Sequence, residues 1–343
     1  MLNARNTVTI GDVARRAGVS VATVSRVIND TAYVSPELAD AVWEAIRELG
    51  YRRDALARGL KTRTSGTIGV IVSNILNPFY TALVRGIEDT ASELGFNMVL
   101  CNTDEDPGKM LNYLRVLHEH RMDGIVLASA PETTAQGRTE LKSVASHVPV
   151  VLVDRRSPFI DASTVLVDNV SGARDAVAHL IELGHERIGI VTGPSETTTG
   201  RDRLAGYRLA HQEYNVPVDE NLIRSTEFTT LPAQKATREL LMTDPRPTAL
   251  FMGNNLMTIG ALRSIRQLGL KITEDISIVG FDDPEWSEII SPTLTAVAQP
   301  TYELGVSAMT LLHRRMQGDQ DVPRELVLSC SLVVRDSTGP CKE

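Results

Sequence analysis

The chain has few cysteines, few aromatic residues and no long hydrophobic run. Its 343 residues include only three cysteines, Cys101, Cys330 and Cys341, with no CxxC pair and no Cys/His spacing typical of a metal site. We therefore expect neither a disulfide framework nor a zinc site. The apolar runs are strand-length, far short of the ~20 residues that cross a bilayer, and the N-terminus lacks the apolar segment of a secretory signal. These absences predict a cytoplasmic protein.

Motifs for common catalytic chemistry are also missing. The sequence contains no GxSxG, P-loop, GxGxxG or HExxH pattern, so it offers no nucleophile elbow, phosphate-binding loop or zinc-protease site. Its seven histidines show no metal-like spacing. His179 and His185 flank an expected helix, where we expect them to form local hydrogen bonds. We predict a protein that is not an enzyme and that carries no cofactor and no metal.

Charge is divided unevenly along the chain. The net charge is −8, yet residues 1–63 hold ten basic and seven acidic side chains, and the rest hold 25 basic and 36 acidic ones. A basic N-terminal segment on an acidic body is typical of a protein that contacts nucleic acid. The excess of basic residues in this segment is small, so it indicates DNA binding only if the segment also contains a DNA-binding motif.

The first fifty residues predict three short helices. Apolar residues in TIGDVARRAGVSVATVSRVIND recur at helical spacing on either side of Gly18, where a tight reversal needs a positive φ. Ser20 is placed to cap the second helix, and a third helix starts at Ser35 and Pro36 and ends at Gly50. Two helices joined by a turn and supported by a third predict a helix-turn-helix that reads DNA. The alternative is a three-helix module that binds protein.

The second helix would enter the major groove with its outward face. Val24, Val27 and Ile28 face inward, so the other side of the helix is left to contact base edges. Apolar Val21 and Ala22 suit thymine methyl groups, whereas hydroxyl, amide and guanidinium groups suit phosphates or guanine. The residues that we predict to contact DNA in this segment are Thr9, Ser20, Val21, Ala22, Thr23, Ser25, Arg26, Asn29 and Tyr33.

This N-terminal sequence resembles that of a known family. TIGDVARRAGVSVATVSRVIND, YVSPELADAVWEAIRELGY and DALARGLK are similar to the head of the lactose-repressor family of bacterial transcriptional regulators, which includes the purine, galactose and ribose repressors. The resemblance implies a hinge helix at about 54–61 that orders on operator DNA. Leu60 would wedge into the minor groove, with Ala57 beside it and Lys61 near the backbone; a packed leucine is the alternative. Gly59 departs from the family's better helix formers and weakens the hinge off DNA.

A polar junction, KTRTSGT, separates the expected DNA-binding domain, residues 1–63, from a body of residues 64–343. After it, β-rich runs such as TIGVIVS, NMVLCNT, GIVLAS, VPVVLVD, STVLVD, RIGIVTG, TALFMG and SIVGFD alternate with helical stretches. Repeated βα units predict parallel sheets flanked by helices. We expect an all-α head and an α/β body of two parallel-sheet lobes around a cleft. The expected lobes are an N-lobe of about 67–166 and 297–326 and a C-lobe of about 167–296 and 327–343.

The body also resembles the lactose-repressor family along nearly its whole length, and through it a periplasmic sugar-binding protein. VDNVSGARDAVAHLIELGHERIGIVTGP, RLAGY, NNLMTIGAL and ISIVGFDDPEWSEIISPTLTAVAQP are among the phrases that carry the resemblance. Together with polar or aromatic side chains placed just after strands, it implies a small-molecule effector in the cleft. The residues predicted to bind the effector are Phe79, Tyr80, Asp154, Thr199, Arg203, Phe228, Asn254 and Asp282.

Each of these residues has a structural alternative. Phe79 and Tyr80 could be ordinary core, Arg203 and Asp282 a structural ion pair, and Phe228 part of a surface loop. A neutral sugar ranks first as effector, an acidic sugar second and a purine-like ligand third. The two arginines after Asp154 invite an anionic ligand, but an arginine at this point is frequent in the family. An asparagine at 255 replaces the family's usual aspartate and removes one acceptor charge.

The resemblance implies a regulator that represses genes of carbohydrate uptake or catabolism. Its partners would be operator DNA, the effector and a second copy of the chain. We expect a homodimer on a palindromic operator, because two-fold symmetry in the protein is matched by the half-sites. A solute-binding receptor and an enzyme with the same body are the rival classes.

Overall fold

The computed structural model describes residues 8–29, 31–51, 65–128, 134–319 and 321–342. It divides the chain into two compact units, residues 1–65 and residues 66–343. No helix among the described residues is long and apolar enough to cross a membrane. The hinge helix predicted at 54–61 falls outside the described residues.

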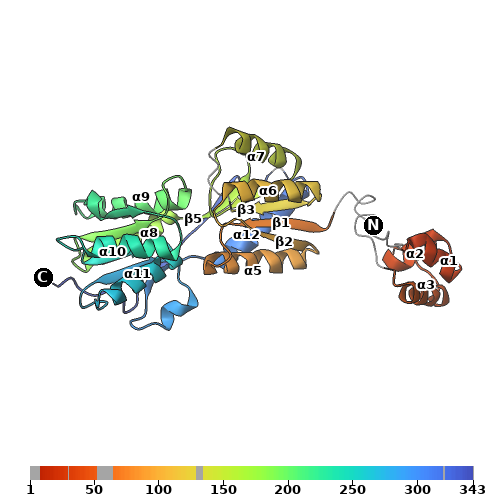
Figure 1. The fold of residues 1–343 in the computed structure, drawn as a ribbon. Helices are drawn as coiled ribbons and strands as arrows, with labels where there is room; N and C mark the ends of the chain where they lie inside the picture. The colour runs from red at the N-terminus through yellow and green to blue at the C-terminus, as the bar shows by residue number, and fades with distance from the viewer. Residues whose placement is uncertain (1–7, 30, 52–64, 129–133, 320, 343) are drawn as a thin grey trace, which may run out of the picture. The chain divides into compact units, whose positions relative to one another are not determined.

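Three helices form the N-terminal unit: α1 (Ile10–Ala17), α2 (Val21–Asn29) and α3 (Pro36–Leu49) (Figure 1). Thr9 and Asp12 close the start of α1 in a capping box, in which the Asp12 carboxylate accepts from the Thr9 N–H at 2.9 Å. Gly18 and Gly50 end α1 and α3 at φ of 67° and 61°, a conformation that glycine adopts without strain. The predicted three helices with a glycine turn are confirmed.

A small apolar cluster joins these helices. Val13 of α1, Val24 of α2 and Val42 of α3 are fully buried in it. Val27 and Ile28 pack at its edge, so α2 buries one face, as its spacing predicts, and leaves the other exposed. The exposed face of α2 is thus held in place by the cluster behind it.

The body is built on two six-stranded sheets, which define an N-lobe and a C-lobe (Figure 1). The N-lobe order is β11-β5-β4-β3-β1-β2 and the C-lobe order is β12-β10-β9-β8-β6-β7. Neighbouring strands pair in parallel except β12, which is antiparallel to β10. The N-lobe strands are β1 (Thr67–Val72), β2 (Asn97–Asn102), β3 (Gly124–Leu127), β4 (Val150–Val153), β5 (Ser163–Val167) and β11 (Glu325–Leu328). The C-lobe strands are β6 (Ile188–Thr192), β7 (Ile223–Ser225), β8 (Ala249–Met252), β9 (Ser277–Phe281), β10 (Thr295–Ala298) and β12 (Ser331–Val333).

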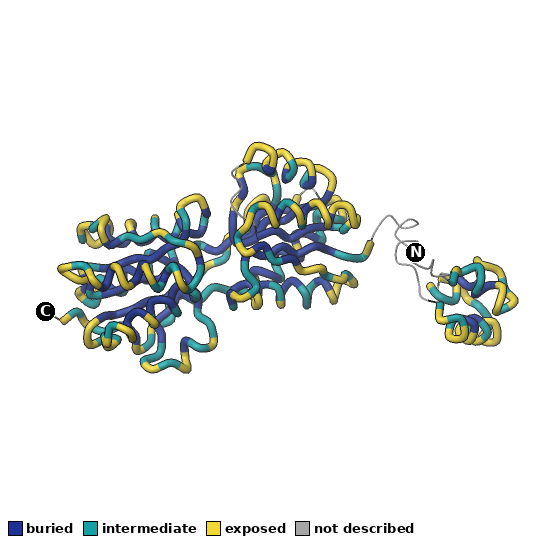
Figure 2. Tube along the Cα trace, in the orientation of Figure 1, coloured by how far each residue is buried: buried dark blue, intermediate teal, exposed yellow. Residues whose placement is uncertain are grey.

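Helices flank both sheets, and two apolar clusters per lobe bury the central strands (Figure 2). Burial on both faces explains why the strand sequences are continuous apolar runs and do not alternate. The N-lobe helices are α5 (Pro78–Glu93), α6 (Pro107–Glu119), α7 (Ala135–His147) and α12 (Thr301–Met316). The C-lobe helices are α8 (Asn169–Glu182), α9 (Thr198–Glu213), α10 (Thr230–Leu241) and α11 (Asn255–Gln267), with short turns η1 (Glu220–Leu222) and η2 (Glu285–Glu288). The predicted two-lobed α/β body is confirmed.

Among the described residues the chain passes between the lobes three times. These crossings follow β5, β10 and β11, one or two residues later than the sequence predicts. Strand pairing sets these boundaries, because Val297 pairs with Phe281 in the C-lobe sheet and Leu328 pairs with Val167 in the N-lobe sheet. Neither lobe is a continuous stretch of chain.

Two glycines bring α5 and α12 into backbone contact. A Cβ on Gly86 would overlap the carbonyl oxygen of Tyr302, and one on Gly305 would overlap that of Leu83. No larger side chain fits without moving the helices apart. Helix α12, which enters the N-lobe from β10, is thereby fixed against α5.

Two histidines anchor the C-terminal segment to the C-lobe. Nε2 of His179 lies 2.9 Å from the Thr338 hydroxyl, and Nε2 of His185 lies 3.0 Å from the Gly339 carbonyl oxygen. Because a carbonyl oxygen only accepts, Nε2 of His185 carries a proton. The prediction of local hydrogen bonds for these histidines is wrong. Their partners are distant in sequence: Thr338 for His179, and Thr248, Ser277 and Gly339 for His185. Helical spacing does not reveal such contacts.

The His185 contact makes stability depend on pH. Burial lowers the pKa of His185, outweighing its bond to the Gly339 carbonyl, and neighbouring His179 lowers it further. Below about pH 6.5, the ordinary histidine pKa, the unfolded chain therefore binds more protons than the native body. We expect the melting temperature to fall from about pH 7.5 to about pH 5.5, and His185→Gln to flatten this dependence. Calorimetry measures the melting temperature at each pH, and His120→Gln, at an exposed site, is the control. An equal dependence of melting temperature on pH in the two variants would contradict this explanation.

Candidate functional site

Two strands, one in each lobe, end in an aspartate with the same unusual backbone. Asp154 follows β4 at φ 68° and Asp282 follows β9 at φ 76°. Each donates its N–H at 3.0 Å to the next strand of its own sheet, Asp154 to Val165 and Asp282 to Val297. Aspartate tolerates this left-handed region better than most residues. Both carboxylates therefore stand at the carboxyl ends of their sheets, where ligands of open α/β sheets bind.

Both aspartates line one small cavity between the lobes, which we call the interlobe cavity. The space left among its side chains is only about 20 Å³, room for about one water molecule. It is lined by all eight residues that the sequence predicts to bind an effector: Phe79, Tyr80, Asp154, Thr199, Arg203, Phe228, Asn254 and Asp282. Four further residues complete the wall: Asn74, Asn77, Glu105 and Arg155.

The start of α5 positions the N-lobe side of the cavity. Asn77 caps the helix by accepting from the Phe79 N–H at 2.9 Å, and Pro78 takes the first helical position. Phe79 and Tyr80 pack edge to face with ring centroids 5.0 Å apart. The Tyr80 hydroxyl donates to the Asp154 carboxylate at 2.9 Å. The two aromatic side chains thus line the cavity and hold one of its carboxylates.

Arg155 lies in the cavity and is already paired. Its guanidinium donates to Glu105 at 2.5 and 2.7 Å and lies 5.1 Å from the centroid of the Phe228 ring. That ring fills the space above Gly193, where any Cβ would overlap it. The next residue, Arg156, donates to Glu325 at 2.8 Å. The charges of both arginines are compensated inside the protein.

Arg203 reaches the cavity from α9 and is fixed on three sides. It donates to Asn169 Oδ1 at 2.8 Å and to the Gly253 carbonyl, and its guanidinium lies 3.8 Å from the centroid of the Phe281 ring. Burial lowers the pKa of Arg203, while Asp282 and Asp154 raise it. Burial raises the pKa of both carboxylates, and Arg203 lowers it in each case. The buried charges therefore depend on one another.

Polar contacts join the lobes at two places beside the cavity. Asn255, the first residue of α11, donates through Nδ2 to Asn77 Oδ1 at 2.7 Å. Elsewhere the Arg156 N–H donates to the Thr198 hydroxyl at 3.3 Å, and the Arg156 guanidinium lies 3.5 Å from Asp202. The lobes are thus closed on each other by their own side chains.

The cavity has the chemistry of a site for a hydroxyl-rich ligand. Carboxylates accept from hydroxyls, guanidinium groups donate to ring and hydroxyl oxygens, and aromatic rings cover apolar faces. Thr199 adds a buried hydroxyl that has no hydrogen-bond partner among the described residues, and Asn254 caps α11 by accepting from the Met257 N–H at 2.8 Å. Within the described ranges, no group of three or more His, Cys, Asp or Glu side chains could hold a metal ion.

Some residues that line the cavity are not predicted from the sequence. Asn77 carried a signal, since an Asn–Pro pair opens a helix directly after a strand. Glu105 carried none, because its partner Arg155 is 50 residues away and it stands in a loop at φ 61°. Arg155 invites an anionic ligand in the sequence, whereas in the structure its partner is Glu105.

On the N-terminal unit, the predicted DNA contacts lie on α2, in the segments that flank it and, for Thr9, at the start of α1. Val21 is 48% exposed and Tyr33 is 89% exposed, and Ala22 and Arg26 are exposed as well. The other predicted contacts of the unit bond locally through their side chains: Thr9, Ser20, Thr23, Ser25 and Asn29. The three contacts predicted in the hinge lie outside the described residues: Ala57, Leu60 and Lys61.

Comparison with known proteins places these two units in one family. A model described as bacterial regulatory proteins, lacI family, matches residues 9–54, and a periplasmic binding protein-like domain matches residues 177–338. The chain is 37% identical to the HTH-type transcriptional regulator DegA of Bacillus subtilis, over 97% of this chain and 98% of that protein. It is 38% identical to the ribose operon repressor of Halalkalibacterium halodurans, over 96% of this chain and 97% of that protein.

A solved structure agrees with these relatives. The Lac repressor dimer bound to operator and the anti-inducer ONPF matches this chain with a TM-score of 0.85 at 29% identity, over 97% of this chain and 100% of that one. The likeness covers both the helical unit and the two-lobed body. The chain therefore belongs to the lacI family of bacterial regulatory proteins, and it is a DNA-binding transcriptional regulator.

Proposed function

We propose that the chain represses genes of carbohydrate uptake or catabolism in the cytoplasm, under the control of a sugar or sugar derivative. The observation that carries this proposal is the interlobe cavity, where carboxylates, guanidinium groups and three aromatic rings converge from both lobes. Two relatives support it, since one is named a ribose operon repressor and another is the Lac repressor bound to operator.

A neutral sugar suits the cavity better than an anionic one. Arg155 and Arg156 are paired with Glu105 and Glu325, and Arg203 compensates the buried aspartates. An anion would have to displace one of these carboxylates from its arginine. A hydroxyl group can instead donate to a carboxylate and accept from a guanidinium N–H, without separating the two.

The ligand would act on the balance between closed and open lobes. The contacts from Asn255 to Asn77 and from Arg156 to Thr198 join the lobes in the closed form. A sugar that bonds to both lobes shifts this balance only by its difference in affinity for the two forms. By reciprocity, its effect on operator binding equals the effect of operator on its own binding. The predicted hinge at Leu60 would carry the change to the head.

Operator affinity in the presence of candidate ligands tests this function. From a panel of neutral sugars, sugar acids and purines, we expect a neutral sugar to change operator affinity by about 5- to 150-fold, measured by fluorescence anisotropy. Arg203→Ala should keep operator affinity and lose the response, because both aspartates lose their shared guanidinium. Arg203→Lys is the test variant to use if the alanine variant does not fold. A folded variant with a normal response would show that Arg203 does not bind the effector. A response of the wild-type protein to purines alone would show that the effector is not a sugar.

Helix α2 is the proposed recognition helix. Its exposed N-terminal residues Val21 and Ala22 are apolar, so they suit the methyl groups of thymine in the major groove. Helix N-termini of this kind contact base edges, while polar side chains beside them bind phosphates.

Selection of binding sites from random DNA tests that assignment. Wild-type protein should select a palindrome, and Ala22→Asn should change the preferred base at one position of each half-site toward adenine, which asparagine can bond at two atoms. Arg16→Gln, on α1, is the matched control and should leave the sequence preference unchanged. Uniform weakening by Ala22→Asn across all sequences would show that this residue does not read a base.

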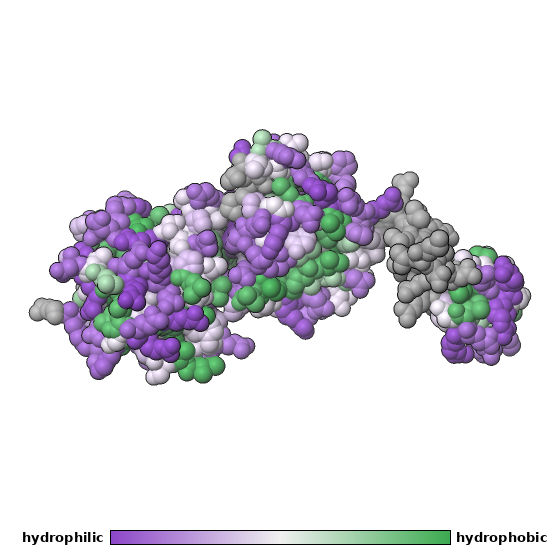
Figure 3. Space-filling model, in the orientation of Figure 1, coloured by the Kyte–Doolittle hydropathy of each residue, from purple (hydrophilic) through white to green (hydrophobic). Residues whose placement is uncertain are grey.

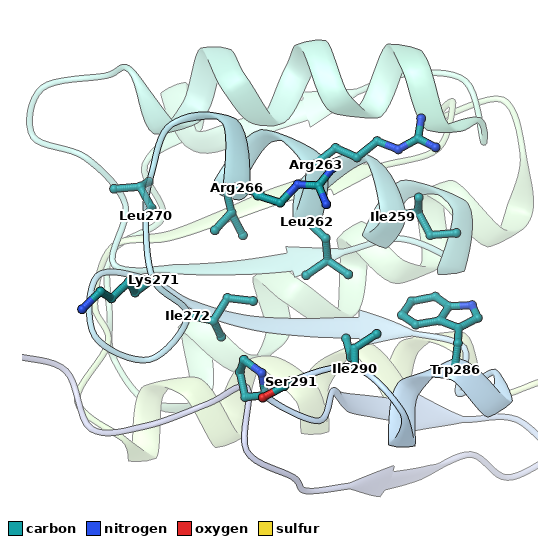
Figure 4. Close-up of a pocket in the computed structure, with 12 residues that line it drawn as sticks. Ile259, Leu262, Arg263, Arg266, Leu270, Lys271, Ile272, Trp286, Ile290 and Ser291 are labelled. Carbon is teal, nitrogen blue, oxygen red and sulfur yellow. The ribbon is translucent and has the colours of Figure 1, made fainter.

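A second copy of the chain is the proposed partner of two apolar surfaces. In the N-lobe, edge strand β2 exposes Val99 at 39% and Leu100 at 38%, and Figure 3 shows apolar side chains gathered over β2 and α5. In the C-lobe, a groove of about 720 Å³ lies between α11 and the segment after η2. In Figure 4, Leu262 points from α11 toward Ile272 and Ile290, and the indole of Trp286 closes one end. We call this the α11 groove.

Measuring the oligomeric state of a groove variant tests this proposed interface. Ile290→Arg places a charge in the α11 groove, so we expect monomers by light scattering and operator affinity reduced about 100-fold or more, because the two heads no longer bind as one unit. Leu231→Arg, at a position that is 70% exposed outside the groove, should leave the dimer intact. A dimeric Ile290→Arg variant would place the interface elsewhere.

A further inference from the structure

The two walls of the α11 groove carry charges of opposite sign. Arg263 and Arg266 line the wall that α11 forms, and we call these two residues the basic wall. The opposite wall starts at η2, where Glu285 and Glu288 stand before and after Trp286, and we call these two residues the acidic turn. Figure 4 shows both arginines along α11, across the hollow from the indole. One face of the C-lobe therefore presents bases and acids side by side.

These charges are accessible to a partner. Arg263 and Arg266 are exposed, and neither has an ion-pair partner in the part of the chain that the structure describes. The same holds for Glu285. Glu288 contacts Arg335 at 3.1 Å, but its side chain is 73% exposed and can accept from a second donor. Four charged groups on this face are thus left to interact outside their own chain.

The arrangement of the groove suits a protein surface. Apolar Ile259, Leu262 and Ile290 line it between the charged positions, and an apolar centre with a polar rim is the usual anatomy of a protein interface. Its third base, Lys271, is already paired with Glu274 at 2.9 Å. A partner must therefore bring an apolar surface, acids for α11 and bases for η2. A second copy of the chain brings all three on the same face.

Two-fold symmetry limits which walls can meet. If α11 packed on α11 of a second copy, Arg263 and Arg266 would face the same two arginines, and like charges across an interface weaken it. If α11 packs on η2 of the second copy, the bases meet acids. The symmetry then makes that contact twice. Exposed ion pairs contribute little one at a time, but this doubled set favours one arrangement over the other.

We propose that the basic wall of each copy binds the acidic turn of the other, so that these charges set the register of the dimer and select an identical chain as partner. The apolar side chains of the groove supply affinity, and the charges supply specificity. A regulator of the same fold with other charges at these positions would leave the arginines without acids. This inference rests on the proposed dimer and names the residues that choose its second member.

Charge reversal on one wall at a time tests the proposal in the full chain. One variant carries Arg263→Glu and Arg266→Glu, and the other carries Glu285→Arg and Glu288→Arg. Each homodimer then brings like charges together, so its dissociation constant should rise about tenfold or more. An equal mixture of the two should form a heterodimer with affinity near that of the wild type, because every contact again joins opposite charges. Sedimentation measures the affinities, and native mass spectrometry separates heterodimer from homodimers.

The dependence of the dimer on salt gives a second readout. Salt screens exposed charges, so the dissociation constant should rise with ionic strength for the wild type and fall for each reversed homodimer. Lys235→Glu with Arg238→Glu is the matched control. Both residues are exposed on α10 outside the groove, and the double change alters the net charge as much as reversal of the basic wall. This control should dimerise like the wild type.

Milder variants keep the test open if a reversed chain does not fold. Arg263→Gln with Arg266→Gln, or Glu285→Gln alone, removes attraction without adding repulsion, so the dimer should lose its sensitivity to salt. An unchanged homodimer of either folded reversal variant, or a mixture that forms no heterodimer, overturns the inference and leaves the α11 groove as the interface. If Ile290→Arg stays dimeric, the interface lies elsewhere, and this inference falls together with that proposal.

Discussion

Charged side chains buried in one cavity constrain the rest of the body. Asp154, Arg155, Arg203 and Asp282 are each at most 7% exposed, and an ionised group is tolerated at such depth only beside an opposite charge or strong hydrogen bonds. Each lobe must therefore present its carboxylate at the same point, which the left-handed residues after β4 and β9 achieve. The contacts from Asn255 to Asn77 and from Arg156 to Thr198 hold the lobes closed around these charges, and a ligand must be accommodated among them.

The sequence predicts elements well where they bury one kind of side chain. Strands such as β1 and β9 are buried almost throughout, so their apolar runs were visible. Edge strands β11 and β12 are only half-buried and left no such run. Helix α9 gives no comparable signal in the sequence, because the face it buries includes Thr199, Gly200 and Arg203, which form no apolar stripe. Its close packing on α8 depends on small and polar residues, and helical spacing of apolar residues cannot show that.

The candidate site was predictable to the extent that it follows strand ends. A polar residue directly after a parallel strand lies at the carboxyl edge whatever the rest of the chain does, which explains why Asp154 and Asp282 could be placed. Glu105 could not, because its role depends on Arg155, which lies 50 residues further along. The orientation of the Asn255 amide depends on partners from two lobes, so the sequence shows the unusual asparagine but not its orientation.

The last part of the chain serves both lobes at once. After residue 300 come α12 and β11, which complete the N-lobe, and then β12, which completes the C-lobe sheet. A stop codon before the end of β11 would therefore damage both halves of the body together, whereas one between β11 and β12 would leave the N-lobe elements complete and shorten only the C-lobe. For the same reason, a chimera that exchanges one lobe with a relative has to be spliced at three points in the gene.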